Sequence, residues 1–362
     1  MKVKSVTYLA VILSMALAPQ LTMAAHIVQN NLVSDVPGLA DAVDASLVNP
    51  WGITRGPATP WWASDNGKSV STLYTGAGVK LGLTVAIPPS GSSPTGTVFN
   101  GTADFKVAGN PSRFIFVTQQ GTIAAWAPAN GTNAVTMVDH SGSAVYTGVT
   151  LGQQGADNRL YAANFLGGVE VYDGAFQPVT LSAGAFTDSA LPPGYAPFNV
   201  QNIDGRIWVS FALREPGGED EVAGKGLGHV DAFDTSGHLI MRLRHGKWMN
   251  APWGLAQAPA NFGKWSHRIL VGQFGSGRIA TFDASNGEFK GLLRGEHGKP
   301  IAIEGLWGIM FGNDGAAGPS NTLFFSAGIE DEAHGLFGTL VPNKLKNHDK
   351  DDDDDHDEDE DE

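Results

Sequence analysis

Two short acidic runs have the clearest capacity for chemistry in this sequence. Glu219-Asp220-Glu221 and Glu330-Asp331-Glu332 each place three carboxyl groups in succession, and Glu304 is a further acidic candidate. Crowded carboxylates repel one another unless water, protons or a shared cation neutralise them, and oxygen ligands of this kind suit Ca²⁺. The pattern therefore predicts a calcium or similar hard-metal site. The alternative is two solvated loops, because three consecutive side chains point in different directions and cannot all bind one ion.

A second set of polar residues flanks short apolar runs. Their amide, carboxyl and imidazole groups are suited to hydrogen bonding a ligand. Asn or Asp next to Gly more often supplies turn hydrogen bonds or a positive φ, and a His beside acidic residues either acts as a base or caps its loop. For His334, the capping role before Gly335 is favoured. The candidate ligand-binding residues are Asn49, Asp65, Asn66, Gln120, Asn164, Asn250, Gln273 and His334.

An internal repeat predicts which elements position these residues. The segment Asn49-Pro50-Trp51-Gly52-Ile53 recurs around Trp253 and Trp307, and those two tryptophans are 54 residues apart. Weaker copies lie at 148–152 and 197–200, and a degenerate copy is expected near Pro111 to Phe114. Periods of about 40 to 50 residues are typical of β-propellers. The tryptophans occupy one repeat position, so we expect them to be core residues packed between neighbouring blades.

Each copy is followed by two β-rich runs separated by small polar or Gly-rich loops. Alternating apolar and polar residues bounded by Gly, Asn and Asp are typical of short antiparallel strands. The sequence therefore predicts an all-β, six-bladed propeller. The run at 31–35 has no blade of its own, so we expect it to pair with the last blade near Phe337 to Val341 and close the ring.

Propeller topology brings the candidate residues to one face. In each blade the innermost strand starts at the face to which the second strand returns, so residues before the first strand and after the second meet on one rim of the central channel. The predicted function is a binding scaffold for a protein, a glycan or a small ligand at that rim. The alternative is a metal-dependent, lactonase-like hydrolase in which Glu304, Asn164, Asn250 and Asp65 surround a divalent ion. No serine-nucleophile, phosphate-loop or His-Glu-x-x-His motif is present.

The two ends of the chain differ from its middle. Lys2 and Lys4 precede an apolar run and small residues end at Ala24, so residues 1–24 read as a signal peptide of an exported protein, periplasmic or extracellular. Residues 25–346 are expected to form one domain, and residues 347–362 a disordered acidic tail. The chain contains no cysteine, which excludes disulfides and thiol catalysis.

The net charge of −14 is concentrated in the tail. Residues 348–362 hold twelve of the 37 acidic and one of the 23 basic residues, which leaves a charge near −3 for the rest. No basic stripe is present, so nucleic acid is not an expected partner. No second apolar segment is long enough to span a membrane after signal cleavage, and we expect a monomer.

Several stretches resemble an uncharacterised secreted bacterial family of NHL-like six-bladed β-propeller proteins. The resemblance covers roughly residues 30–340, and it implies the propeller fold and an exported location but no activity. The stretches that carry it are Asn31-Leu32-Val33-Ser34-Asp35, Asn49-Pro50-Trp51-Gly52-Ile53, Leu191 to Gln201, Glu221-Val222-Ala223-Gly224, Gly228-His229-Val230-Asp231 and Ala333-His334-Gly335-Leu336-Phe337-Gly338.

Overall fold

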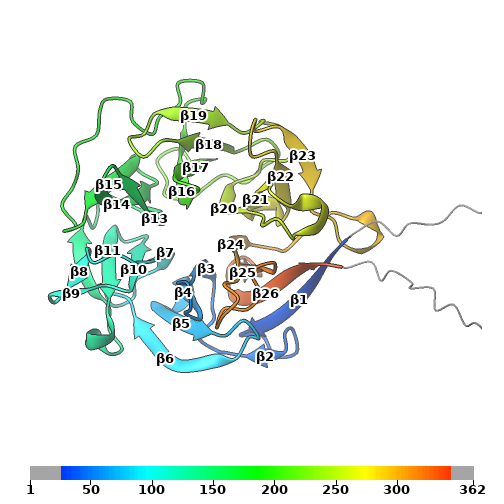
Figure 1. Cartoon of the computed structure of the whole chain (residues 1–362), viewed down its shortest axis with the longest axis horizontal. Helices are drawn as coiled ribbons and strands as arrows, with labels where there is room; N and C mark the ends of the chain where they lie inside the picture. The colour runs from blue at the N-terminus through cyan, green and yellow to red at the C-terminus, as the bar shows by residue number, and fades with distance from the viewer. Residues whose placement is uncertain (1–25, 344–362) are drawn as a thin grey trace, which may run out of the picture.

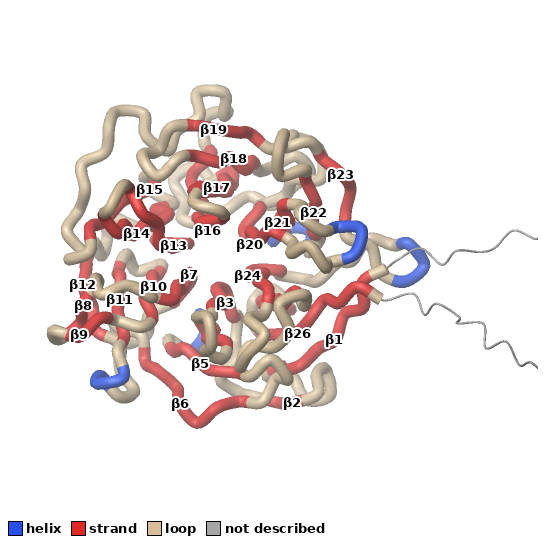
Figure 2. Tube along the Cα trace, in the orientation of Figure 1, coloured by secondary structure: helices blue, strands red, loops and turns tan. Residues whose placement is uncertain are grey.

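The computed structural model describes residues 26–343, and their strands form six sheets around one axis (Figures 1 and 2). The predicted signal peptide and acidic tail lie outside the described residues. The first three blades contain β3 (Pro50–Thr54), β4 (Trp61–Asp65), β5 (Val70–Tyr74) and β6 (Lys80–Ala86); β7 (Pro94–Phe99), β10 (Phe114–Thr118), β11 (Thr122–Trp126) and β12 (Val135–Asp139); and β13 (Tyr146–Gln154), β14 (Asp157–Asn164) and β15 (Val169–Asp173).

The other three blades follow the same order from the axis outward. They contain β16 (Tyr195–Ile203), β17 (Arg206–Leu213), β18 (His229–Phe233) and β19 (Leu239–Arg242); β20 (Pro252–Gln257), β21 (Ile269–Gln273), β22 (Ile279–Phe282) and β23 (Phe289–Leu292); and β24 (Leu306–Phe311), β25 (Leu323–Ile329), β26 (His334–Pro342) and β1 (Ile27–Ser34). The remaining elements are β2 (Ala42–Val43), the hairpin β8 (Lys106–Val107) and β9 (Asn110–Pro111), and the short 3₁₀ helices η1 (Asn66–Lys68), η2 (Pro128–Asn130), η3 (Gly263–Trp265), η4 (Phe274–Ser276) and η5 (Glu296–Gly298).

Strand alternation explains how the blades pack on one another. In β14, Leu160 and Ala162 join the apolar cluster shared with blade 2, whereas Tyr161 and Ala163 join the cluster shared with blade 4. Successive side chains of a strand point to opposite faces, so each blade supplies apolar residues to both neighbours. The hydrophobic core is therefore a set of layers between blades.

The N-terminal strand closes the ring, as the sequence predicts. β1 pairs antiparallel with β26, from Ile27 opposite Pro342 to Ser34 opposite Leu336 (Figure 1). Both ends of the described chain thus belong to blade 6, and the six-bladed fold is confirmed.

The degenerate copy expected near Pro111 to Phe114 is not the inner strand of blade 2. That strand is β7, in which Thr95-Gly96 occupies the place of Trp-Gly, and it pairs with β10. The prediction was wrong because β7 lacks the aromatic residue on which the repeat search relied. The β8–β9 hairpin also separates it from its partner strand.

The three repeat tryptophans are buried core residues, but they do not pack in the separate layers between blades. Trp51 stacks on Trp307 with ring centroids 3.6 Å apart, and Trp253 meets both rings edge-on at 6.2 and 5.8 Å. One cluster joins them to side chains of blades 3 and 4. A Cβ on Gly52 would lie 2.7 Å from Thr95 O, so the lack of a side chain at this position lets neighbouring inner strands approach closely. Because the inner strands are this close, the tryptophan rings can meet on the axis.

No helix within residues 26–343 is long and apolar enough to cross a membrane.

Candidate functional site

The predicted rim forms where the loops before the inner strands meet the loops after the second strands. Asn49 shows this most directly: its side-chain amide donates to Glu332 Oε2 (2.5 Å) and Asn66 Oδ1 (3.4 Å). Its Oδ1 accepts the indole N–H of Trp307 (3.0 Å). One buried amide of blade 1 therefore fixes groups from blades 1 and 6 together.

Several predicted ligand-binding side chains are hydrogen bonded to other groups of the protein. Asn66 donates to Gln119 (3.1 Å), and Gln120 Oε1 accepts the backbone N–H of Ser93 (2.7 Å). Asn164 Oδ1 accepts the N–H groups of Val145 and Leu166, while its Nδ2 donates to Glu170 (2.7 Å). These residues shape the rim.

The amides of blade 5 behave in the same way. Asn250 Oδ1 accepts the N–H of Gly224 (2.6 Å), and Gln273 Oε1 accepts the N–H of Asn250 (2.7 Å). Gln273 is fully buried. Asn250 therefore holds the loop of blade 4 against blade 5, and Gln273 fixes the backbone of Asn250.

Asp65 lies away from the rim surface, inside the protein. It is fully buried, and its Oδ2 accepts the hydroxyl hydrogen of Thr72 (2.7 Å). Thr72 Oγ1 also lies 2.9 Å from the hydroxyl oxygen of Tyr74, which donates to Asp44 Oδ2 (2.6 Å). Burial raises the pKa of Asp65 well above its usual value. Of the predicted hydrolase ring of Glu304, Asn164, Asn250 and Asp65, the last residue is thus buried away from solvent.

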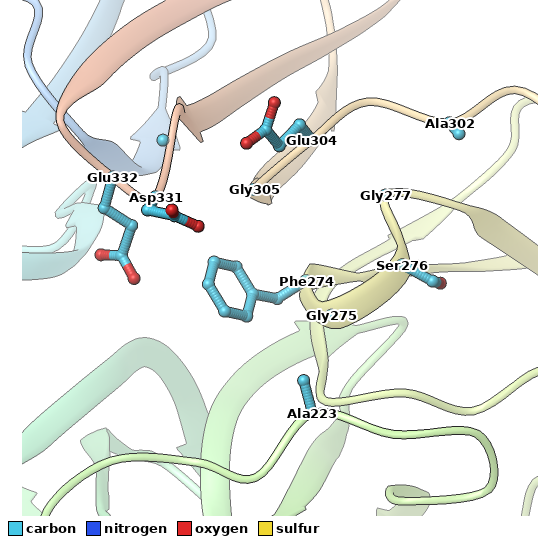
Figure 3. A pocket seen from close by; sticks show the side chains of 11 residues that line it. Ala223, Phe274, Gly275, Ser276, Gly277, Ala302, Glu304, Gly305, Asp331 and Glu332 are labelled. Carbon is cyan, nitrogen blue, oxygen red and sulfur yellow. The ribbon is translucent and has the colours of Figure 1, made fainter.

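A cavity of about 570 Å³, the rim pocket, opens between blades 5 and 6 and is bordered by a loop of blade 4 (Figure 3). The side chains of Glu304, Asp331 and Glu332 lie on one side of the ring of Phe274, which stacks on Trp307 with centroids 4.0 Å apart. The lining residues are Ala223, Phe274, Gly275, Ser276, Gly277, Ala302, Glu304, Gly305, Gly328, Asp331 and Glu332.

The acidic run of blade 6 has an unusual backbone. Glu330, Asp331 and Glu332 all have positive φ (54°, 51° and 64°), a conformation that costs a non-Gly residue on the order of 1 kcal/mol or more. Glu304 Oε1 accepts the N–H of Glu330 (3.1 Å), and Asn49 holds Glu332. Burial raises the pKa of Glu332, although the Asn49 hydrogen bond opposes the shift.

Of the acidic run of blade 4, only Glu221 is partly buried and close to the charge of Glu332. Glu219 and Asp220 are exposed, whereas Glu221 is half-buried. Burial and the nearby charges of Glu332 and Asp220 raise the pKa of Glu221 to about 8. Within residues 26–343, no three acidic or histidine side chains are arranged to hold a metal ion. The calcium site stays a prediction.

His334 faces the N-terminal segment. Its Nδ1 lies 2.7 Å from Asp35 Oδ2, and Asp35 Oδ1 accepts the N–H of Gly335 (2.8 Å). The carboxylate of Asp35 raises the pKa of His334. The contact with Glu330 is longer, at 3.8 Å. His334 thus fastens the loop to the strand that closes the ring, in the capping role favoured by the sequence.

Sequence reasoning missed Phe274, the aromatic floor of the rim pocket. It directly follows β21, the second strand of blade 5, and so occupies the same loop position in its blade as the two acidic runs do in theirs. The ligand-binding residues predicted from the sequence are all polar or charged. An aromatic residue there was the available signal.

The geometry defines the chain as a six-bladed β-propeller with an acidic pocket on one face. No family model matches the sequence. The chain is similar to two uncharacterised proteins of Acanthamoeba polyphaga mimivirus, with 29% and 28% identity; each match covers 87% of this chain, and 86% and 80% of those proteins.

Solved propellers resemble the chain in fold. A structural genomics protein of unknown function from Bacteroides thetaiotaomicron has a TM-score of 0.56 at 11% identity, covering 88% of this chain and 76% of that chain. The soluble aldose sugar dehydrogenase of Escherichia coli (TM-score 0.53, 12% identity) and virginiamycin B lyase of Staphylococcus aureus (0.51, 12%) match over 88% of this chain and 100% and 99% of theirs. At such identities the likeness shows the fold alone.

Proposed function

We propose that the chain is an exported binding propeller whose rim pocket holds the positively charged group of an organic ligand. The single observation that carries this proposal is the set of three carboxylates, Glu304, Asp331 and Glu332, beside the ring of Phe274. None of the described residues that line the pocket is basic. The proposed export, to the periplasm or the exterior, rests on the N-terminal sequence.

Charge and shape favour an ammonium or guanidinium group. A cation over an aromatic face gains roughly 0.5–2 kcal/mol, and more where water is excluded. The volume of about 570 Å³ falls in the range of small-molecule sites and exceeds the needs of a single ion. A ligand carrying such a group on an apolar stem would place the charge among the carboxylates and the stem on Phe274.

A hydrogen bond within the protein also preorganises the pocket. Asn49 fixes the carboxylate of Glu332, so less side-chain freedom is lost on binding. Burial raises the pKa of Glu221, and the nearby charge of Glu332 raises it further. A bound cation offsets this charge and favours the ionised form, so binding is expected to release protons.

Calorimetric titration of the mature protein tests the proposal, with agmatine, tetramethylammonium and CaCl₂ as probes. Agmatine is expected to bind, and the Asp331→Asn/Glu332→Gln variant to weaken it at least about tenfold, or 1.4 kcal/mol. Glu296→Gln, which removes an exposed carboxylate outside the pocket, is the control and leaves binding unchanged.

Three results would overturn this function. Equal affinity in the double variant would move the site elsewhere. Binding of Ca²⁺ without either organic cation would replace it with the calcium site that the acidic runs predict. Hydrolysis of a lactone or ester that stops on addition of EDTA would replace a binding function with the hydrolase alternative.

A further inference from the structure

A second cavity lies at the outer edge of blade 4, and nothing in the proposed function uses it. It has a volume of about 370 Å³ and is lined by residues in and around β18 and β19 of blade 4 and by the β22–β23 turn of blade 5. We call it the blade-4 pocket. Its lining includes the polar residues Asp188, His229, Asp231, Arg242, Arg244 and His245.

Asp231 is the residue of this pocket that indicates a bound ligand. The residue is 2% exposed, and its buried Oδ2 receives no hydrogen bond from an N–H or hydroxyl group in the described part of the chain; its polar neighbour is the carboxyl group of Asp188. Burial and the neighbouring charge of Asp188 raise its pKa to about 7. A buried polar atom without a partner is costly and uncommon in folded proteins, so a ligand hydroxyl that reached it would recover a hydrogen bond.

The formal charges around Asp231 cancel in pairs. Asp188 is held by both Nε and Nη2 of Arg242, at 2.5 and 2.6 Å. Arg244 lies 3.5 Å from Glu288 at the pocket mouth. A cationic ligand would meet two guanidinium groups, whereas an anionic ligand would meet Asp188 and Glu288. The pocket therefore matches a neutral ligand rich in hydrogen-bonding groups.

Two imidazole rings supply a flat face beside these polar groups. His229 and His245 stack with ring centroids 4.4 Å apart and planes at 13°, and Tyr195 meets His229 edge-on. Burial and the neighbouring His245 lower the pKa of His229 to about 4, so this ring is neutral near pH 7. His245 is exposed, and its Nε2 lies 2.9 Å from Gly226 O.

We infer that the blade-4 pocket binds a neutral saccharide. Ring hydroxyls donate and accept at once, so they match an unpartnered Asp231 beside the paired side chains of Asp188 and Arg242. The apolar face of a sugar ring matches the flat surface of the stacked imidazoles. The cavity volume falls within the range of small-ligand sites.

Saturation-transfer NMR on the intact protein tests this inference, with maltose, cellobiose and N,N′-diacetylchitobiose as probes. At least one disaccharide is expected to receive saturation. His245→Ala, which changes an exposed residue, and Asp231→Leu, which removes the buried carboxyl group, should each weaken binding about tenfold or more. His238→Ala alters another exposed histidine of blade 4 and should leave binding unchanged.

The outcomes separate this site from the rim pocket. Neither variant of the blade-4 pocket should alter agmatine binding, and the Asp331→Asn/Glu332→Gln variant should not alter saccharide binding. The inference is overturned if no disaccharide receives saturation, if inorganic phosphate binds in their place, or if His245→Ala binds them as tightly as the unaltered protein does.

Discussion

The rim has two halves built from the same repeat positions, and they use their polar residues differently. In blades 1–3, Asn66, Gln120 and Asn164 are all hydrogen bonded to other groups of the protein. In blades 5 and 6, the amides Asn250 and Gln273 are hydrogen bonded in the same way, but the carboxylates of Glu304, Asp331 and Glu332 line an open pocket. The shared repeat position thus decides where a side chain lies, but not whether it is free to bind.

Charge explains the difference. The second and third strands are joined by short loops in both halves, 119–121 in blade 2 and 330–333 in blade 6, but the first carries amides and the second carries carboxylates. Amides pair readily with nearby backbone groups. A carboxylate has two acceptor oxygens, so Glu304 and Glu332, which each accept a hydrogen bond from the protein, can still face a cation.

The largest effect is expected from the side chain that joins the two halves. Trp253 is 4% exposed on the axis, and its indole N–H donates to Thr147 O of blade 3 (3.1 Å). Trp253→Ala should lower the free energy of unfolding by about 3–5 kcal/mol, measured by urea denaturation. Trp248→Ala, at a partly exposed residue stacked on Phe289, is the control and should cost less. Unchanged stability with lost ligand binding would show that Trp253 belongs to a site.

The second prediction separates shaping residues from binding residues. Asn164→Ala leaves the N–H groups of Val145 and Leu166 without their acceptor, so the free energy of unfolding should fall by about 1–3 kcal/mol. Agmatine binding should not change. Glu332→Gln should have the opposite profile, with weaker binding and nearly unchanged stability. Calorimetry and urea denaturation of both variants test this contrast. If the two variants changed agmatine affinity and the free energy of unfolding equally, the two halves of the rim would not differ in role.

Sequence alone could predict the blades, the ring closure and the rim, because these follow from repeat spacing and from the alternating direction of strands. It could not place the tryptophans on the axis, since the distance between inner strands depends on glycine contacts such as that of Gly52 with Thr95. Nor could it separate Asp65, which is buried against Thr72, from Asp331, which faces a pocket. That difference depends on side-chain direction at the strand ends.

The third prediction concerns pH and the acidic half. The pKa of Glu221 in the folded protein, about 8, lies above its value of about 4.3 in an unfolded chain. Its contribution to stability is therefore present at low pH and is lost as the pH rises from about 4.3 toward 8. Glu221→Gln should flatten this part of the stability profile, measured by urea denaturation across the range. Titration of agmatine in buffers of different ionisation enthalpy should show proton release that the variant lacks.

The smallest effect is expected from His334, the first residue of β26, which follows the loop of the second acidic run. Asp35 raises its pKa, so its stabilising contribution is present below the unfolded value of about 6.5 and is lost as the pH rises through the folded value. His334→Gln should remove this dependence and speed hydrogen exchange of the β1 amides at low pH. Gly335 still donates to Asp35, so the strand stays in place. Identical pH dependence of exchange in both proteins would mean that the imidazole does not fasten the ring closure.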